Sequence, residues 1–331
     1  MAVTECHVVA IADPSQIGEA RRMGSDLARS VGFDEEGAGR IAIAVTEAAA
    51  NIVKHGGGGH VLLRADGGGV ELIALDSGPG MSSVPQSMRD GFSTAGTPGT
   101  GLGAIVRQAS EFDIYATPGR GTAIVADFRP RRPTEGARDP RVGGVAVPKR
   151  GETVCGDAWA KVESGARTLV LVADGLGHGP LAADASARAV DVLIRHAAQP
   201  VEAIVQRMHE ALRPTRGAAV GIAEVDRGDG VVRFVGVGNI AASVVSDGNV
   251  RSMVSHHGTL GHDVRKIQTF QYPWPKDALL VMTSDGIGTR WDLATYPGLA
   301  QRSPTVVAAV LYRDFQRGND DATVVVLRGA A

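Results

Sequence analysis

Two glycine-rich loops constrain the fold of the first third of this chain. The first loop, DSGPGM, covers residues 76–81, and the second, GTGLGA, covers residues 99–104. Asp76 ends an apolar run, whereas the second loop leads directly into a helical pattern. Glycine lets a backbone approach a ligand closely, and N–H groups at a helix N-terminus bind phosphate. We therefore expect one carboxylate and two glycine loops to surround a phosphorylated ligand.

The elements around these loops indicate a small α/β domain over residues 1–128. We expect helices at residues 13–32 and 34–55, the second of which stops at four consecutive glycines, and a third helix from residue 101. Apolar runs predict strands at residues 7–11, 60–65, 70–76, 111–117 and 121–128. Helices packed on one small sheet give a two-layer domain.

The remainder of the chain has a different pattern. Residues 129–141, RPRRPTEGARDPR, are rich in proline and charge without periodicity, which predicts a linker. Over residues 142–331 short apolar strands dominate, with two helical stretches at residues 180–196 and 201–212. We expect this part to be an α+β domain, a β-sandwich flanked by helices.

Composition limits what such a protein can bind. Aromatic residues make up 4% and the formal net charge is −2, which argues against nucleic acid and against a membrane surface as partners. The two cysteines, Cys6 and Cys155, have no CxxC spacing, which fits a reducing compartment. The HCx₅R pattern of a cysteine nucleophile does not occur either, so we expect Cys155 to be a packed residue. No segment has the pattern of a signal peptide or of a membrane span. We expect a cytoplasmic protein.

Several residues of the first domain suit a nucleotide. Glu47 and Asn51 are four residues apart, so they share one face of the expected helix. Asn51 offers a neutral oxygen to Mg²⁺, and Asp76 offers an acceptor to the exocyclic amine of a purine. Backbone N–H groups of the second loop would hold phosphates, and Rossmann and P-loop patterns do not occur. The candidate cofactor-binding residues are Asn51, Asp76, Gly78, Gly80, Gly99, Thr100, Gly101, Leu102, Gly103, Ala104 and Thr122.

The motifs ExxxN, DxGxG and GxGLG, in this order, resemble the Bergerat-fold ATPases of the histidine-kinase and gyrase superfamily. Within it, residues 1–128 are similar to the anti-sigma-factor serine kinases. The resemblance implies that ATP binds with Mg²⁺ on Asn51, with adenine on Asp76, and under a mobile lid at residues 82–98. It also implies that Glu47 is the general base for a substrate hydroxyl, and that Thr122 approaches the phosphates.

Four aspartates of the second domain lie at strand ends or in tight turns: Asp157, Asp174, Asp285 and Asp320. The apolar runs VLVAD and LLVMTSD place carboxylates at the rim of a buried sheet, where converging acids must share a cation or a proton. Oxygen ligands without a His or Cys cluster indicate Mg²⁺ or Mn²⁺. Two such ions would activate water for attack on phosphorus.

The segments GETVCGDAW, VADGLGHGPLAADAS, SDGI and DDATVVV resemble the metal-dependent serine/threonine protein phosphatases in their SpoIIE/RsbX branch. The resemblance implies that Asp157, Asp174 and the Gly175 carbonyl hold one ion, and that Asp174, Asp285 and Asp320 hold the other. Asp321 would lie beside the last ligand. Two roles remain open for His178, that of a catalytic acid and that of a residue that packs at the start of a helix. Arg150 is a candidate for holding phosphate.

The leading hypothesis is a bifunctional serine/threonine kinase and phosphatase. By resemblance, its partner is a STAS-domain anti-sigma-factor antagonist or a stressosome scaffold protein. One alternative is a phosphatase whose first domain senses ATP without transferring phosphate. Glu47 favours the kinase over this sensor, because only phosphate transfer needs a general base. Another alternative is a non-enzymatic module that sequesters a regulator, and such a module would be expected to lack some of the motif residues. The sequence leaves the oligomeric state open.

Overall fold

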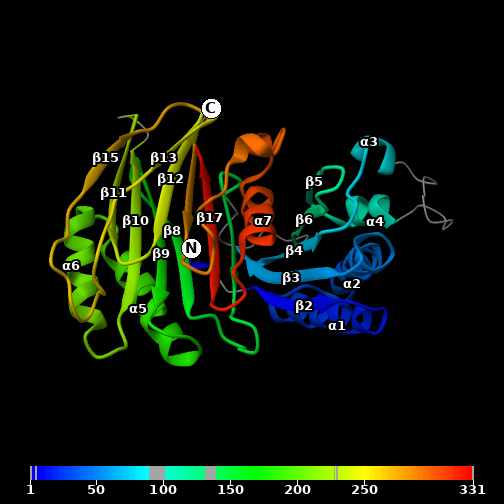
Figure 1. Ribbon diagram of the computed structural model, residues 1–331. Helices are drawn as coiled ribbons and strands as arrows, with labels where there is room; N and C mark the ends of the chain where they lie inside the picture. Colours follow the sequence, from blue (N-terminus) through cyan, green and yellow to red (C-terminus); the bar gives the residue numbers. More distant parts are fainter. Residues whose placement is uncertain are drawn as a thin grey trace. The chain divides into compact units, whose positions relative to one another are not determined.

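The computed structural model describes residues 2–3, 6–88, 101–130, 139–226, 228 and 230–329 of the chain. The chain divides into two compact units, residues 6–139 and residues 1–5 together with 140–331 (Figure 1). Within the described ranges, no helix is long and apolar enough to cross a membrane.

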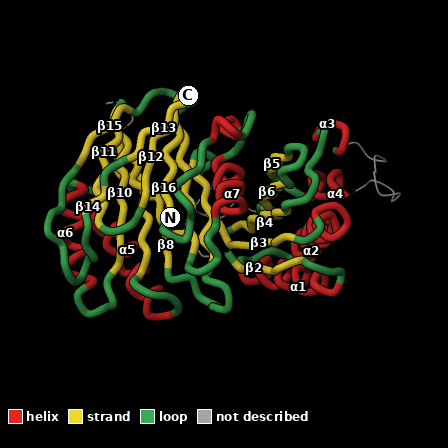
Figure 2. Tube along the Cα trace, viewed as in Figure 1, coloured by secondary structure: helices red, strands yellow, loops and turns green. Residues whose placement is uncertain are grey.

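The first unit contains one antiparallel sheet with helices packed on one face (Figure 2). Its strand order is β2-β3-β4-β6-β5. The strands are β2 (His7–Ile11), β3 (Gly59–Asp66), β4 (Gly69–Asp76), β5 (Glu111–Ala116) and β6 (Thr122–Phe128). The helices are α1 (Ser15–Ser30), α2 (Glu35–Asn51), the π-helix η1 (Ile52–Gly56), α3 (Val84–Ser87) and α4 (Gly101–Gln108).

The helices α1, α2 and α4 bury their apolar stripes against this sheet. Ile41 and Val45 of α2 and Ile105 of α4 share one core cluster with Leu63 and Leu72 of the sheet. The long helix expected at residues 34–55 changes character near its end, because its α-helical part stops at Asn51 and one π-helical segment follows. Gly57 then adopts a left-handed conformation, with φ of 65°, and ends the segment.

The second unit is built from two sheets. The first has the order β1-β8-β9-β10-β11-β14, with β15 also paired to β11, and the second has the order β13-β12-β16-β17-β7. The strands of the first are β1 (Ala2–Val3), β8 (Asp157–Ser164), β9 (Arg167–Gly175), β10 (Ala218–Asp226), β11 (Val231–Val237), β14 (Ser255–His256) and β15 (Phe270–Pro273). Those of the second are β7 (Val142–Val147), β12 (Ala241–Ser246), β13 (Asn249–Ser252), β16 (Leu279–Thr283) and β17 (Ala322–Arg328).

Strand β9 shows how this unit is layered, because alternate side chains enter two different cores. Val170 and Val172 pack between the two sheets with Trp159. Leu169 and Leu171 pack instead under α5 (Pro180–His196) and α6 (Val201–Leu212). This architecture agrees with the predicted fold classes, a two-layer α/β domain and a sheet-rich domain flanked by helices.

A third helix, α7 (Pro304–Phe315), corrects the expectation of two helices in the second unit, and it packs on β17 and β7. Its run PTVVAAVLY is apolar at successive positions, so the sequence lacks the 3.6-residue period that marks an amphipathic helix. Two short 3₁₀ helices, η2 (Leu293–Thr295) and η3 (Leu299–Gln301), precede it.

Candidate active sites

In the first unit, the side chains of Glu47 and Asn51 meet the beginning of α4. A Cβ atom at Gly101 would stand 3.0 Å from Asn51 Oδ1 and 3.2 Å from Glu47 Oε2. A larger residue at the start of α4 would therefore crowd both side chains. The first N–H groups of a helix have no partner within it, so this end of α4 presents donors next to one carboxylate and one amide.

The end of α2 is also fixed beside Asp76. A Cβ atom at Gly56 would stand 2.5 Å from the Asp76 Cβ, so only glycine permits η1 to approach the end of β4 this closely. Gly78 donates its backbone N–H to Asp76 Oδ1 at 2.9 Å, which orients the carboxylate. π-Helical segments are rare and occur often at functional sites. Here η1 follows Asn51 directly and leads toward Asp76.

Thr122 lies next to Asp76. It is the register partner of Asp76 across the β4–β6 ladder and is 5% exposed. The turn before β6 folds back on the end of β4, where a Cβ at Gly121 would stand 2.0 Å from the Asp76 carbonyl oxygen. Thr122 is thus beside the residue predicted to recognise the base, and its approach to the phosphates stays a prediction.

Other predicted residues of this site are only partly described. Gly80 has φ of 67° and contacts the Thr117 carbonyl, so it shapes the turn after Asp76. Leu102 packs in the core, so at this position only the backbone is available to a ligand. Gly103 is buried and Ala104 is half-buried on α4. Gly99, Thr100 and residues 89–98 of the expected lid lie outside the described residues.

In the second unit, the predicted metal-binding aspartates meet at one end of the paired sheets. Asp157 begins β8 and is the register partner of Asp174 near the end of β9. Asp285 follows β16 and Asp320 precedes β17, and these strands are antiparallel neighbours, so both residues lie at the same end of that sheet. Ser284 Oγ donates to Asp157 Oδ2 at 2.6 Å, which joins the two groups across the sheets.

Burial and mutual repulsion together raise the pKa values of these acids. Burial raises the pKa of Asp174 to about 9, and the charges of Asp157, Asp285, Asp320 and Asp321 add to the effect. Burial likewise raises the pKa of Asp157 to about 7, although the hydrogen bond from Ser284 opposes the shift. Carboxylates that repel one another this strongly are stable in the ionised form only beside a cation.

The donor set fits hard divalent cations, since it consists of carboxylates and the Gly175 carbonyl. In the described part of the chain, however, Asp174, Asp285 and Asp320 do not bring their oxygens within 4.8 Å of one another. Ligands of one Mg²⁺ lie at about 2.1 Å from it. These three side chains would therefore have to move closer together to share one ion.

Asp321 is held differently from Asp320. Its Oδ1 accepts the backbone N–H of Lys149 at 2.8 Å, and a Cβ at Gly156 would stand 2.6 Å from its Oδ2. Asp321 thereby fixes the loop that leads into Asp157. Arg150 is exposed and Cys155 is buried in this loop.

The rim of the cluster contains further polar side chains. His178 Nδ1 lies 2.6 Å from Glu152 Oε1. Burial raises the pKa of Asp321, and the backbone N–H of Lys149 opposes the rise. Asn239 donates to Asp285 Oδ2 at 2.7 Å. Burial and the charge of Asp320 raise the pKa of Asp285, while Asn239 and the charge of Arg317 oppose the rise. Sequence reasoning missed Asn239 and Arg317, because neither belongs to a motif.

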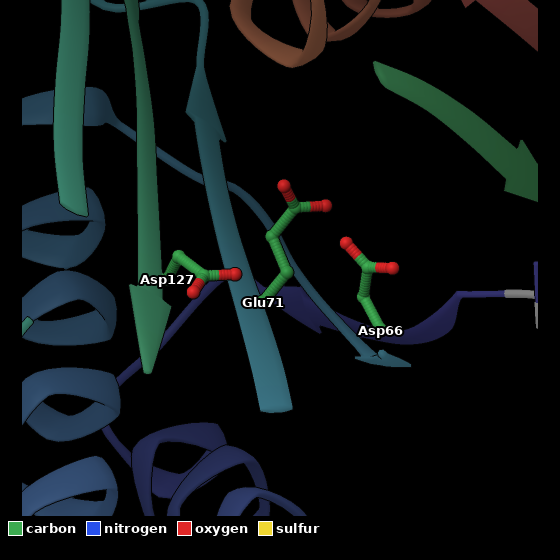
Figure 3. A group of neighbouring side chains, drawn as sticks. All are labelled: Asp66, Glu71 and Asp127. Atoms are coloured by element: carbon green, nitrogen blue, oxygen red, sulfur yellow. The ribbon is translucent and has the colours of Figure 1, made fainter. Parts of the chain in front are cut away.

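A second group of acids has the spacing of a metal site but a different environment. Asp66, Glu71 and Asp127 come from neighbouring strands of the first unit, and their oxygens lie within 4.8 Å of one another (Figure 3). Arg64 pairs with Glu71 at 2.6 Å, and Arg129 pairs with Asp127 at 2.6 Å. Arg129 also lies 3.7 Å from Asp66, so each of the three carboxylates has a guanidinium partner and the group is an ion-pair network.

Two known protein families match separate parts of the chain. The family described as "Histidine kinase-like ATPase domain" matches residues 10–128. The family "Stage II sporulation protein E (SpoIIE)" matches residues 164–329, which is half of the chain. The chain belongs to the SpoIIE family. Its C-terminal part is a PP2C-like phosphatase domain, and its N-terminal part is a histidine kinase-like ATPase domain.

Two relatives from Bacillus subtilis (strain 168) cover the two parts of this SpoIIE-family chain. The serine/threonine-protein kinase RsbT is 39% identical over 111 residues, which are 32% of this chain and 84% of RsbT. The phosphoserine phosphatase RsbX is 28% identical over 140 residues, which are 42% of this chain and 70% of RsbX. The predicted resemblance is thus confirmed, and the matches support a role in partner-switching regulation.

Solved structures extend the comparison to the fold of the SpoIIE-family part. A structure from work on the bacterial stressosome has a TM-score of 0.53 and 29% identity, covering 57% of this chain and 98% of its own. The crystal structure of RsbX in complex with magnesium has a TM-score of 0.50 and 22% identity, and the match covers 59% of this chain and 98% of the RsbX chain. The PP2C domain of SpoIIE from Bacillus subtilis, with a regulatory fragment, has a TM-score of 0.50 and 19% identity, covering 80% of both chains. The last two, at these identities, show the fold alone.

Proposed function

We propose that this protein both phosphorylates and dephosphorylates serine or threonine on one STAS-domain regulator. The ATPase domain would transfer phosphate from ATP, and the phosphatase domain would remove it. The likeness to RsbT and RsbX, which are named as a kinase and a phosphoserine phosphatase, motivates the pairing of opposed activities. The chain would then set the phosphorylation state of its partner by the balance of two rates.

The proposed kinase activity is supported above all by one observation: Glu47 and Asn51 both lie next to Gly101. In this proposal, Asn51 holds Mg²⁺ and α4 holds the phosphates of ATP. Glu47 lies on the same helix face and accepts the proton of the incoming hydroxyl. A domain that only sensed ATP would need Asn51 but would have no use for a carboxylate at this place.

The hydrolytic half rests on the carboxylate cluster of the phosphatase domain. Asp157, Asp174 and the Gly175 carbonyl would hold one Mg²⁺ or Mn²⁺, and Asp174, Asp285 and Asp320 the other. Divalent ions bound there supply stabilisation of phosphoryl charge and activation of water. Asp321 keeps the Asp157 loop in place, and Asn239 orients Asp285.

The experiment uses the full-length Asp174→Asn variant, so that the phosphatase cannot erase the product. The protein is incubated with ATP, Mg²⁺ and serine- or threonine-containing STAS-domain proteins, and phosphate on these proteins is measured by mass spectrometry. We expect transfer in this background and a loss of about 10²–10⁴ in rate when Glu47→Ala is added, because a general base is removed. ATP binding, measured by calorimetry, should persist in the double variant.

Two further measurements on the wild-type protein, its phosphatase rate with and without ATP and its binding to the partner, separate the alternatives. If no STAS-domain protein gains phosphate although ATP changes the phosphatase rate of the wild-type protein, the first domain is a sensor. If neither phosphate transfer nor phosphate hydrolysis occurs while the partner still binds tightly, the chain is a sequestering module.

A further inference from the structure

Two large aliphatic side chains are exposed beside the carboxylate cluster of the phosphatase domain. Leu176 is 55% exposed and Leu181 is 58% exposed. Leucine side chains are among those most often buried in folded proteins, so an exposed pair close to a candidate active site calls for a physical reason. We call these two residues the leucine rim.

The backbone holds the leucine rim in a fixed place. Leu176 comes two residues after Asp174, and its N–H donates to the Gly217 carbonyl at 2.9 Å. Leu181 lies in the first turn of α5. Gly175 and Ala182 touch, because a Cβ at Gly175 would stand 2.0 Å from the Ala182 carbonyl oxygen. Both leucines therefore flank one tight backbone contact at the end of β9.

The neighbourhood of the leucine rim is polar. His178, which lies between the two leucines in the sequence, pairs with Glu152, and an Arg216 guanidinium nitrogen lies 3.0 Å from the Cβ position of Gly177. Farther along α5 the exposed face carries ion pairs, Arg188 with Asp184 and Arg195 with Asp191. An apolar contact bordered by polar groups is typical of a surface that binds another protein.

We propose that the leucine rim binds the phosphoprotein substrate by receiving an aliphatic side chain close to its phosphoserine. This inference rests on the proposed phosphatase function. We infer this partner because the leucine rim adjoins the carboxylate cluster. A phosphorylated side chain that reaches Asp174 brings the residues on either side of it over Leu176. A small phosphate ester has no flanking residues and gains nothing from this contact. The rim thus selects a peptide segment with aliphatic neighbours.

The test compares three substrates with Mn²⁺ and with Mg²⁺. They are p-nitrophenyl phosphate, a phosphoserine peptide with leucine on both sides of the phosphoserine, and its twin with glycine there. We expect the kcat/KM of the wild-type protein to be about tenfold higher for the leucine peptide than for the glycine peptide. The free energy gained by burying one aliphatic side chain is large enough for this difference. The preference should disappear in Leu181→Ser and in Leu176→Ser.

Ile194→Ser provides the matched control, because Ile194 is 46% exposed on the same helix, thirteen residues beyond Leu181. It should keep the preference for the leucine peptide. If Leu181→Ser and Leu176→Ser also keep it, or if the wild-type protein cleaves all three substrates without preference, the rim proposal is wrong and the phosphatase proposal stands. If the wild-type protein cleaves none of them, both proposals fail.

Discussion

At the residue scale, Asp174 is the side chain on which the two-ion assignment depends most. It is the only one of the candidate ligands assigned to both ions, and four other carboxylates raise its pKa together with burial. We expect Asp174→Asn to abolish hydrolysis of a phosphoserine substrate and to leave ATP affinity unchanged, because independent sites on separate domains behave additively. Phosphate release by the purified variant at a rate near that of the wild type would contradict the two-ion assignment.

Asp76 allows a comparable test in the ATPase domain. A charge-assisted hydrogen bond in a partly buried pocket is typically worth about 1.5–3 kcal/mol, so Asp76→Asn should weaken ATP binding by roughly ten- to a hundredfold. GTP should bind poorly to the wild type, since guanine presents a carbonyl where adenine presents an amine. Calorimetry with both nucleotides measures this, and equal affinities would exclude base recognition by Asp76.

At the scale of single elements, the junction of α2 with α4 depends on the absence of a side chain. Gly101→Ala would place a methyl group 3.0–3.2 Å from Asn51 and Glu47, so these side chains must shift by a few tenths of an ångström. Small misplacements of reacting groups are costly, and we expect phosphate transfer to fall about tenfold.

Gly39→Ala is the control for this prediction. Gly39 also lies in a helix, α2, but a Cβ there would meet no atom within 4 Å. Alanine should therefore increase the free energy of unfolding by about 0.5–1 kcal/mol and leave the rate of phosphate transfer unchanged. A transfer rate that falls equally in both variants would show that α4 does not depend on this junction.

The elements also show what a sequence can reveal. Strands such as β9 and β16 were predictable because apolar runs end abruptly at Asp174 and near Asp285, and the same endings pointed to the carboxylate cluster. The hydrogen bond from Ser284 to Asp157 joins residues 127 positions apart, and only the paired sheets bring them together. The neighbourhood of Thr122 and Asp76 was hidden for the same reason, since it depends on the β4–β6 register.

At the scale of the whole molecule, the carboxylate cluster links stability to pH. Folding raises the pKa of Asp157 to about 7 and of Asp174 to about 9 from an ordinary value of 3.8. Between roughly pH 4 and pH 9 the folded state therefore binds more protons than the unfolded state, and stability falls as the pH rises through this window. We expect the melting temperature in EDTA to fall across it.

Divalent cations should reverse this trend. They compete with protons for the same oxygens, so the increase in melting temperature caused by Mn²⁺ should grow with pH. Thermal unfolding in EDTA and in Mn²⁺ at several pH values, at constant ionic strength, measures both effects. In Asp174→Asn most of the pH dependence should vanish; if it persists in full, other groups control the stability.

The small strand β1 gives the chain an unusual path. Ala2 and Val3 pair with Ala160 and Trp159 of β8, so the chain begins in the phosphatase sheet, forms the unit of residues 6–139, and then returns to complete that sheet. A phosphatase fragment that starts at the linker would thus lack β1, which belongs to its own sheet. The uncovered backbone of β8, close to Asp157, could then recruit a foreign strand. An isolated phosphatase fragment should therefore self-associate more readily than the same domain within the full-length chain.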